Sequence, residues 1–356
     1  MMNMSVVGKK IVLIGGAGFI GHNLALALNQ RGAKVEIIDS LQINNLNAFA
    51  TNVDNIPNRQ LYLHLIQDRL ERLYAAGINL HTIDARDYQT LSPLLGAIGP
   101  QIIIQLAAIA HASRANKHPF STFDHNLRTL ENVLDSSRDY VEHFIYLSSS
   151  MVYGDFQSGL VVEDTVCEPM GIYGALKYAG EKLVIAYNQV FDVPYTIVRP
   201  SALYGERCVS RRVGQIFIER ALRGLTLTIH GDGQDHLDFT YVEDFVDGMV
   251  KIMENENAKN EILNLTYGAS RSISEMVEIL KKEFGQVDLQ YMPKDNLMPD
   301  RGTLSVEKAK RLIGYKPQFP LEIGFVKYIK WYKSLMKSYA HLFEEQQPDL
   351  KLVGGS

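Results

Sequence analysis

The stretch KIVLIGGAGFIG, residues 10–21, decides the fold of this chain. Lys10–Ile14 is a short apolar run typical of a buried strand, and the glycines after it lead into helical periodicity at His22–Arg31. Further apolar runs alternate with helical segments such as Ser121–Asp135; the runs are Lys34–Asp39, Gln101–Leu106, His143–Ser148 and Tyr195–Arg199. This alternation predicts an α/β fold, a doubly wound parallel sheet with helices on both faces and ligands at the carboxyl ends of its strands.

After Pro200 the pattern becomes less regular and indicates a smaller C-terminal lobe. A turn at Gly231–Gly233 and several prolines interrupt this half, while Asn260–Thr266 has the pattern of one more strand that returns to the sheet. The predicted division assigns 1–200 plus about 240–266 to the sheet domain, about 201–239 plus 267–345 to the lobe, and 346–356 to a polar tail. The connection 41–80 contains one expected helix, near Leu61–Ala75, without an assigned role, and Phe325–Leu342 is expected to be an amphipathic helix.

The composition is that of an ordinary globular protein. The 356 residues are 46% hydrophobic and 21% charged, and the formal net charge of −4 makes nucleic acid and membrane surfaces poor candidate partners. Two cysteines, Cys167 and Cys208, form neither a disulfide framework nor a metal-spaced cluster, so a reducing cytoplasm and no metal site are expected. The most apolar stretch, Ile102–Ala110, is shorter than the about 20 residues that span a bilayer, and glycines break the first apolar run, so neither a membrane segment nor a signal peptide is predicted.

The glycine-rich turn predicts a dinucleotide site. Gly15 and Gly18 permit a tight turn and a close backbone approach to a pyrophosphate, and Gly21 allows the helix to pack near the strand. Phe19 and Ile20 then stand at the amino end of that helix, which favours negative charge, and are expected to contact the cofactor. The plain alternative is a strand-to-helix connection without a ligand.

Asp39 at the end of the second strand specifies which dinucleotide is expected. Its carboxylate can accept hydrogen bonds from the adenosine ribose hydroxyls and would repel a 2′-phosphate. No Lys or Arg lies between Asp39 and Arg59, so NAD is favoured over NADP. Asp84, followed by Ala85, is expected to end a third strand and to hold the adenine amino group, with a solvated turn as the alternative reading.

Two Tyr-x-x-x-Lys pairs, Tyr173/Lys177 and Tyr178/Lys182, compete for a catalytic role. At about 100° per residue the two pairs point about 140° apart on one helix, so only one of them can face a cofactor. Tyr173/Lys177 is favoured because it lies near the helix start.

Oxidation of a hydroxyl needs a base that removes its proton as hydride leaves the same carbon. Lowering a tyrosine pKa from about 10 to about 7 takes roughly 4 kcal/mol, and an ammonium about 6 Å away supplies about 2.8 kcal/mol at an effective dielectric near 20. Lys177 is therefore expected to tune Tyr173 and to hydrogen-bond the nicotinamide ribose. One hydroxyl of Ser148–Ser150, after a strand, is expected to bridge the substrate oxygen to Tyr173.

Several motifs in order, from about Lys10 to Gly314, resemble the extended short-chain dehydrogenase/reductases, the NAD-dependent nucleotide-sugar epimerases and dehydratases such as UDP-galactose 4-epimerase. They are Gly15-x-x-Gly18-x-x-Gly21, Asp39, Leu106-Ala107-Ala108, the segment Ser148–Gly154, Tyr173-x-x-x-Lys177 and the segment Arg199–Gly205. The resemblance implies an NAD-binding Rossmann domain, a catalytic set of Ser149, Tyr173 and Lys177, and cofactor contacts from Leu106, Ala107, Ala108 and Pro200.

The same resemblance implies the substrate site and the assembly. Asn126 matches a family asparagine near the active site, and Gly231–Asp244 matches the signature of a nucleotide-sugar lobe; Ser149, Ser150, Asn126, Arg211 and Arg301 are the expected substrate contacts. A homodimer is expected, in which Ser121–Asp135 and Tyr173–Val190 pair across a two-fold axis.

Departures from the family pattern narrow the range of reactions and substrate contacts expected of this chain. Where dehydratases carry an Asp-Glu pair this chain has Ser150 and Met151, so dehydration is not expected. Leu237 replaces a family arginine that binds the diphosphate, which leaves Arg211, Arg212 and Arg301 as candidates, each of which could equally be a surface residue. The segment Cys208–Arg212 also resembles a subgroup that acts on GDP-heptose or related bacterial sugars.

The sequence thus favours an NAD-dependent nucleotide-sugar oxidoreductase that transfers hydride at sugar C4 with tightly bound NAD, of the 4-epimerase type. A 4-dehydrogenase that releases the keto sugar, with GDP-heptose as one possible substrate class, remains open. A non-catalytic NAD-sensing regulator would keep the fold without turnover. A reductase of small steroid-like ketones fits the catalytic set but not the signature of the lobe.

Overall fold

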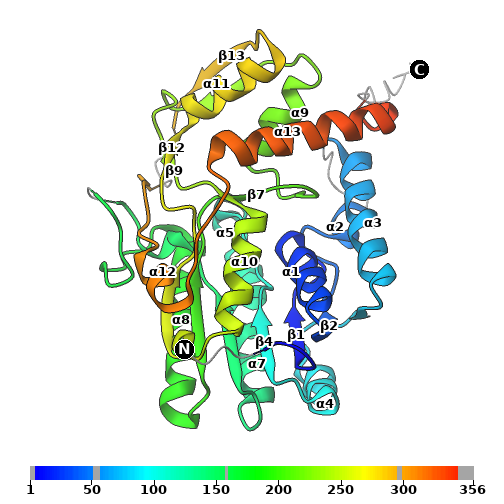
Figure 1. The fold of residues 1–356 in the computed structure, drawn as a ribbon, viewed down its shortest axis with the longest axis vertical. Helices are drawn as coiled ribbons and strands as arrows, with labels where there is room; N and C mark the ends of the chain where they lie inside the picture. The colour runs from blue at the N-terminus through cyan, green and yellow to red at the C-terminus, as the bar shows by residue number, and fades with distance from the viewer. Residues whose placement is uncertain (1–4, 51–56, 157–158, 295–298, 344–356) are drawn as a thin grey trace, which may run out of the picture.

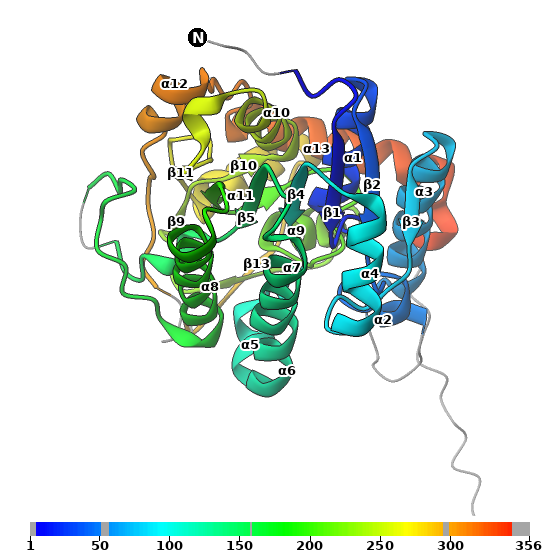
Figure 2. The same ribbon diagram turned by 90° about the horizontal axis from the view of Figure 1, so that it is seen from below.

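The computed structural model describes residues 5–50, 57–156, 159–294 and 299–343, so the predicted polar tail lies outside the described residues. Seven parallel strands form the central sheet in the order β11-β6-β5-β4-β1-β2-β3 (Figures 1 and 2). They are β1 Lys10–Ile14, β2 Lys34–Ile38, β3 Asn79–His81, β4 Ile102–Gln105, β5 His143–Leu147, β6 Tyr195–Arg199 and β11 Glu261–Asn264. The predicted doubly wound parallel sheet is confirmed, including the late strand that returns to it.

Helices cover both faces of the sheet because its strands are buried on both sides. One face packs against α1 (Phe19–Gln30), α10 (Val242–Met253) and α12 (Glu307–Ile313). The other packs against α4 (Tyr88–Ile98), α7 (Thr129–Ser137) and α8 (Gly171–Phe191), as Figure 2 shows. The carboxyl ends of all seven strands therefore meet at one edge, where the chain leaves for the second lobe.

The third strand is shorter than predicted. It ends at His81, and the N–H of Ile83 donates to the His81 carbonyl at 3.0 Å, which turns the chain away from the sheet. Asp84 consequently lies in the loop after the strand, and its expected place as the strand's last residue is wrong.

A second hydrophobic core lies outside the sheet domain. It gathers side chains from α9 (Val213–Ala221), α11 (Ile273–Phe284), α13 (Leu321–Ser338) and β8 (Leu227–His230), and β8 pairs with β13 (Leu289–Met292). The connection 41–80 contributes α2 (Leu46–Ala50) and α3 (Arg59–Ala75), whose apolar residues Phe49, Leu61, Tyr62, Leu65 and Ile66 belong to this core. The connection placed by the sequence in the sheet domain thus packs into the lobe, and Figure 1 shows α3 near the end of α13.

The expected helix Ser121–Asp135 is interrupted. It consists of α6 (Pro119–Phe123), a π-helical turn at Asp124–Arg128 and α7. π-turns are rare and concentrate at functional sites. Among the described residues, no helix combines the length and the apolarity that a membrane crossing requires.

Candidate active site

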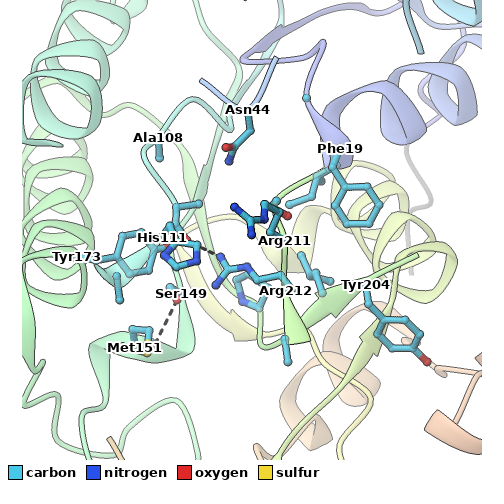
Figure 3. A pocket seen from close by; sticks show the side chains of 18 of the residues that line it. Phe19, Asn44, Ala108, His111, Ser149, Met151, Tyr173, Tyr204, Arg211 and Arg212 are labelled. Atoms are coloured by element: carbon cyan, nitrogen blue, oxygen red, sulfur yellow. Dashed lines mark hydrogen bonds between the residues drawn. The ribbon is translucent and has the colours of Figure 1, made fainter. Parts of the chain in front are cut away.

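A cavity of about 900 Å³ runs along the carboxyl edge of the sheet and continues under the lobe (Figure 3). Its wall begins at the glycine turn, passes Ser149 and Tyr173, and ends at β8 and Arg301. Ligands of doubly wound sheets bind at this edge.

The turn between β1 and α1 is shaped for close approach. Gly15 has φ +79°, and a Cβ there would lie 2.7 Å from the backbone nitrogen of Ala107. A Cβ on Gly21 would lie 2.5 Å from Cα of Gly16, so the helix can start here only with glycine at this position. Gly18 precedes α1 without a side-chain cap, which leaves the first N–H groups of the helix for an anion.

Asp39 stands beside this turn. Its Oδ2 accepts the N–H of Ala17 at 3.0 Å and its Oδ1 accepts the N–H of Leu41 at 2.8 Å. Burial raises the pKa of Asp39, while these two hydrogen bonds and the charge of Arg69 oppose that shift. The carboxylate is thereby held at the end of β2, in the wall of the cavity.

The other predicted cofactor residues lie in the same wall: Phe19, Ile20, Asp84, Ala85, Leu106, Ala107, Ala108 and Pro200. The carboxylate of Asp84 is already engaged, because Arg86 donates from Nη2 at 2.6 Å and from its backbone N–H at 3.0 Å. The hydrogen bonds from Arg86 lower the pKa of Asp84. An adenine amino group at Asp84 would have to share a carboxylate that is held by an ion pair.

Tyr173 lies in the first turn of α8, and α5 (Ala112–Lys117) fixes where that helix starts: Asn116 Oδ1 accepts the N–H of Ile172 at 3.0 Å. The Tyr173 side chain is 8% exposed. Burial raises the pKa of Tyr173, and the charge of Arg212, a hydrogen bond with the Ser149 hydroxyl and the charge of Arg301 lower it. The phenol is thus a buried group whose ionisation depends on nearby cations.

Two adjacent serines have different partners. Ser148 Oγ donates to Glu181 Oε1 at 2.5 Å, and Glu181 also binds Arg199 Nη2 at 2.7 Å in a buried ion pair. Ser149 Oγ accepts the N–H of Met151 at 3.2 Å, lines the cavity with Tyr173 and lowers the pKa of the Tyr173 phenol. Of the serines after β5, Ser149 is therefore the one placed for proton transfer.

Lys177 is buried one turn along from Tyr173. Its Nζ donates to the carbonyl of Leu147 at 2.6 Å and lies 5.0 Å from the ring centre of Tyr146. Burial lowers the pKa of Lys177 to about 7, which Glu181 partly opposes. The sequence predicted Lys177 as the main cation acting on Tyr173; in the structure its ammonium binds the Leu147 carbonyl, and the charges of Arg212 and Arg301 also lower the pKa of Tyr173.

The competing pair points elsewhere. Tyr178 packs beside Val152 and Tyr153, outside the cavity wall, and the exposed Lys182 places its Nζ 4.9 Å from the Tyr178 ring centre. The two pairs thus point in different directions, as the 140° separation requires, and the pair near the helix start, Tyr173/Lys177, is the one that lines the cavity.

The three candidate arginines all line the cavity with Ser150. Arg212 donates from Nη2 to the carbonyl of Ala110, and Arg211, two residues before α9, donates its backbone N–H to Gln215 Oε1 at 2.9 Å. Burial lowers the pKa of Arg301 to about 10, helped by the charge of Arg212, so it stays cationic at neutral pH. The lobe thus presents a cationic wall opposite Tyr173.

Asn126 is placed differently from the expectation of direct substrate contact. It lies in the π-turn behind the cavity wall, where its Oδ1 accepts the N–H of Ile109 at 2.7 Å. The π-turn aims the amide at the loop that follows β4. In the structure Asn126 therefore holds this loop in place.

The sequence reasoning missed His111, Asn44 and Arg69, which also line the cavity. Figure 3 shows His111 between Tyr173 and Arg212. Burial, followed by Arg212 and Arg211, lowers the pKa of His111 to about 4, so the ring is neutral at physiological pH. The position of His111 after β4, at the carboxyl edge of the sheet, was a sequence signal that could have identified it. Arg69 has no such signal, because only the packing of α3 brings it to the cavity.

A glycine cradle at a helix N-terminus, a carboxylate after β2 and a buried Tyr-Lys-Ser set define a dinucleotide-dependent enzyme of the Rossmann class. Residues 11–266 match the model of the NAD dependent epimerase/dehydratase family, and the chain belongs to this family. It is accordingly an NAD-dependent enzyme, which sets aside the non-catalytic regulator.

Similar proteins extend over nearly the whole chain. An uncharacterized UDP-glucose epimerase of Bacillus subtilis, YtcB, is 31% identical over 92% of this chain and 98% of its own length. UDP-glucuronate 4-epimerase 4 of Arabidopsis thaliana is 26% identical over 92% of this chain and 76% of its own length. The UDP-glucuronic acid 4-epimerase of Bacillus cereus, solved with UDP-glucuronic acid and NAD, has a TM-score of 0.82 at 26% identity and covers 92% of this chain and 100% of its own.

Proposed function

We propose that this enzyme is a nucleotide-sugar 4-epimerase. The observation that carries the proposal is a single cavity with a proton-transfer set, Ser149 and Tyr173, on its sheet wall and guanidinium groups on its lobe wall. A diphosphate bound to those groups would bring the attached sugar to Tyr173. The similar proteins named for UDP-glucose and UDP-glucuronate epimerisation support the same substrate class.

The cofactor half of the site follows from the glycine turn and Asp39. The turn and the first N–H groups of α1 would hold the NAD diphosphate, Asp39 would accept from the adenosine ribose, and Leu106–Ala108 with Pro200 would enclose the remainder. NAD, when bound, supplies the hydride acceptor. Lys177 would exchange the Leu147 carbonyl for the nicotinamide ribose, a contact that both its burial and its position permit.

Tyr173 would take the proton of the sugar C4 hydroxyl as hydride leaves C4, which gives a 4-keto sugar and a neutral phenol. Ser149 would bridge the sugar oxygen to the phenol, because it lines the cavity with Tyr173 and lowers the pKa of the phenol. Return of hydride to the opposite face of C4, with the proton from Tyr173, would complete an epimerisation. Neutral His111 beside Tyr173 would offer the sugar one donor or one acceptor.

Arg211, Arg212 and Arg301 would replace the family arginine that is Leu237 here. Guanidinium groups match phosphate oxygens bidentately. Since Arg212 and Arg301 also lower the pKa of Tyr173, a bound diphosphate that neutralises them would raise it, and the oxidised nicotinamide would have to supply the compensating charge.

The proposal is tested by incubating the purified enzyme with UDP-, GDP-, CDP- and dTDP-sugars and following both sugar configuration and absorbance at 340 nm. Epimerisation should convert one sugar to its C4 epimer at equilibrium without net NADH. Net NADH and a released keto sugar would instead establish the 4-dehydrogenase. No reaction with any nucleotide sugar would contradict the proposal.

A homodimer is a second element of the proposal. Phe120 and Phe123 on α6 are 85% and 48% exposed, and Val190 on α8 is 68% exposed, so both helices expected to pair carry exposed apolar side chains. Light scattering should report twice the 40.1 kDa of one chain at micromolar concentration. Phe123→Asp combined with Val190→Asp should shift this mass toward the monomer, and a monomeric wild-type protein would contradict the pairing.

A further inference from the structure

Arg69, on the inserted helix α3, is a fully buried cation in the wall of the cavity. Its side chain is 0% exposed. Its Nε donates to the carbonyl of Arg207 at 2.9 Å, and its Nη2 donates to the same oxygen. Its Nη1 is buried without a hydrogen-bond partner among the residues that the structure describes.

Among the described residues, no carboxylate forms a salt bridge with Arg69. Asp39 is close enough to act on it electrostatically, but both carboxylate oxygens of Asp39 accept backbone N–H groups. Arg207 adds a second positive charge nearby. A buried cation without a counter-ion is costly, and a protein retains one where a ligand supplies the missing charge.

Three observations associate this cation with the cofactor half of the cavity, where α3 packs against α1. Arg69 lines the cavity together with Gly18 and Asp39. Its charge acts on His22, one turn into α1, and so reaches the helix N-terminus that attracts anions. The Arg207 carbonyl, not a carboxylate, holds its guanidinium, so its positive charge remains available.

We propose that Arg69 is the fixed counter-charge for the diphosphate of the dinucleotide, delivered to the cofactor site by the inserted helix α3. The helix is anchored in the lobe core through Tyr62, whose hydroxyl donates to the buried Glu219 at 2.7 Å. The cation is thus positioned before the cofactor arrives, and the lobe contributes to a site that the sequence assigned to the sheet domain alone.

The test compares ligands with and without phosphate in Arg69→Gln, which removes the charge and keeps a donor for the Arg207 carbonyl. Competition against the fluorescence of bound NADH gives the affinities of ADP-ribose and adenosine. ADP-ribose should bind about 10- to 100-fold more weakly to the variant, as expected for loss of a charged partner, while adenosine affinity changes less than about 2-fold. The melting temperature of the ligand-free variant should stay level or rise.

Arg72→Gln is the matched control, because Arg72 lies on the same helix, is exposed and pairs with Asp68 at 3.0 Å. It should leave both affinities unchanged. Arg69→Lys, which keeps the charge, should retain ADP-ribose affinity within a few-fold and serves if the glutamine variant fails to fold. Equal loss of ADP-ribose and adenosine affinity in the glutamine variant, or no loss of either, would overturn the proposal.

Discussion

Tyr173→Phe is expected to slow hydride transfer by about 10²–10⁴-fold, the range typical of losing a general base, while NAD remains bound. The substitution removes the phenolic hydroxyl and leaves the ring packed against Met151 and Ala115. The cavity wall therefore keeps its shape, so the substitution should lower the rate of hydride transfer and leave the affinity for NAD unchanged.

Single-turnover reduction of bound NAD at 340 nm, with a nucleotide sugar that the wild-type enzyme accepts, measures this effect. Tyr178→Phe is the control: it removes the same atom from the same helix at a position outside the cavity wall, and its rate should match the wild type. A silent Tyr173→Phe together with an inactive Tyr178→Phe would move the catalytic assignment to the second pair.

Lys177→Met should lower turnover by about 10²-fold or more and weaken NAD binding at the same time. In the proposed mechanism the ammonium holds the cofactor and stabilises the ionised phenol, so both quantities would depend on this one group. Lys182→Met, on the exposed face of α8, should change neither. Normal NAD affinity in Lys177→Met would refute the proposed ribose contact.

The lowered pKa of Lys177 has a separate consequence for stability. Because burial lowers its pKa from 10.5 to about 7, the unfolded chain binds more protons than the folded one between these values. The contribution of Lys177 to stability is therefore fully present above about pH 10.5, declines as the pH falls and is lost below about pH 7. Ligand-free Lys177→Met should lack this component in melting curves recorded across that interval, and an unchanged pH dependence would contradict it.

The divergence of the two Tyr-x-x-x-Lys pairs was predictable because a helix has a fixed angular period. Tyr173 and Tyr178 differ by five residues, which separates their side chains by about 140° whatever surrounds the helix. The choice of Ser149 over Ser148 came from family resemblance, and the structure adds the physical reason that Ser148 is occupied by Glu181.

The electrostatics of the site could not be predicted in the same way. The Coulomb estimate for Lys177 treated it as a full positive charge at an intermediate dielectric. Burial lowers the pKa of Lys177 to about 7, and its Nζ donates to the Leu147 carbonyl. The cations that act on Tyr173 come from residues 39 and 128 positions later in the chain, Arg212 and Arg301, which the lobe folds over the sheet.

The sequence by itself determined the parallel sheet, the glycine cradle, Asp39 beside it and the face of α8 that carries Tyr173 and Lys177, because each depends on local periodicity or on backbone sterics within a few residues. Only the tertiary structure decided that α3 packs into the lobe, that Arg69 reaches the cofactor end and that Asn126 holds the loop after β4. Those contacts join segments far apart in the chain, and whether a side chain is buried, paired or left with an uncompensated charge depends on neighbours that local sequence does not specify.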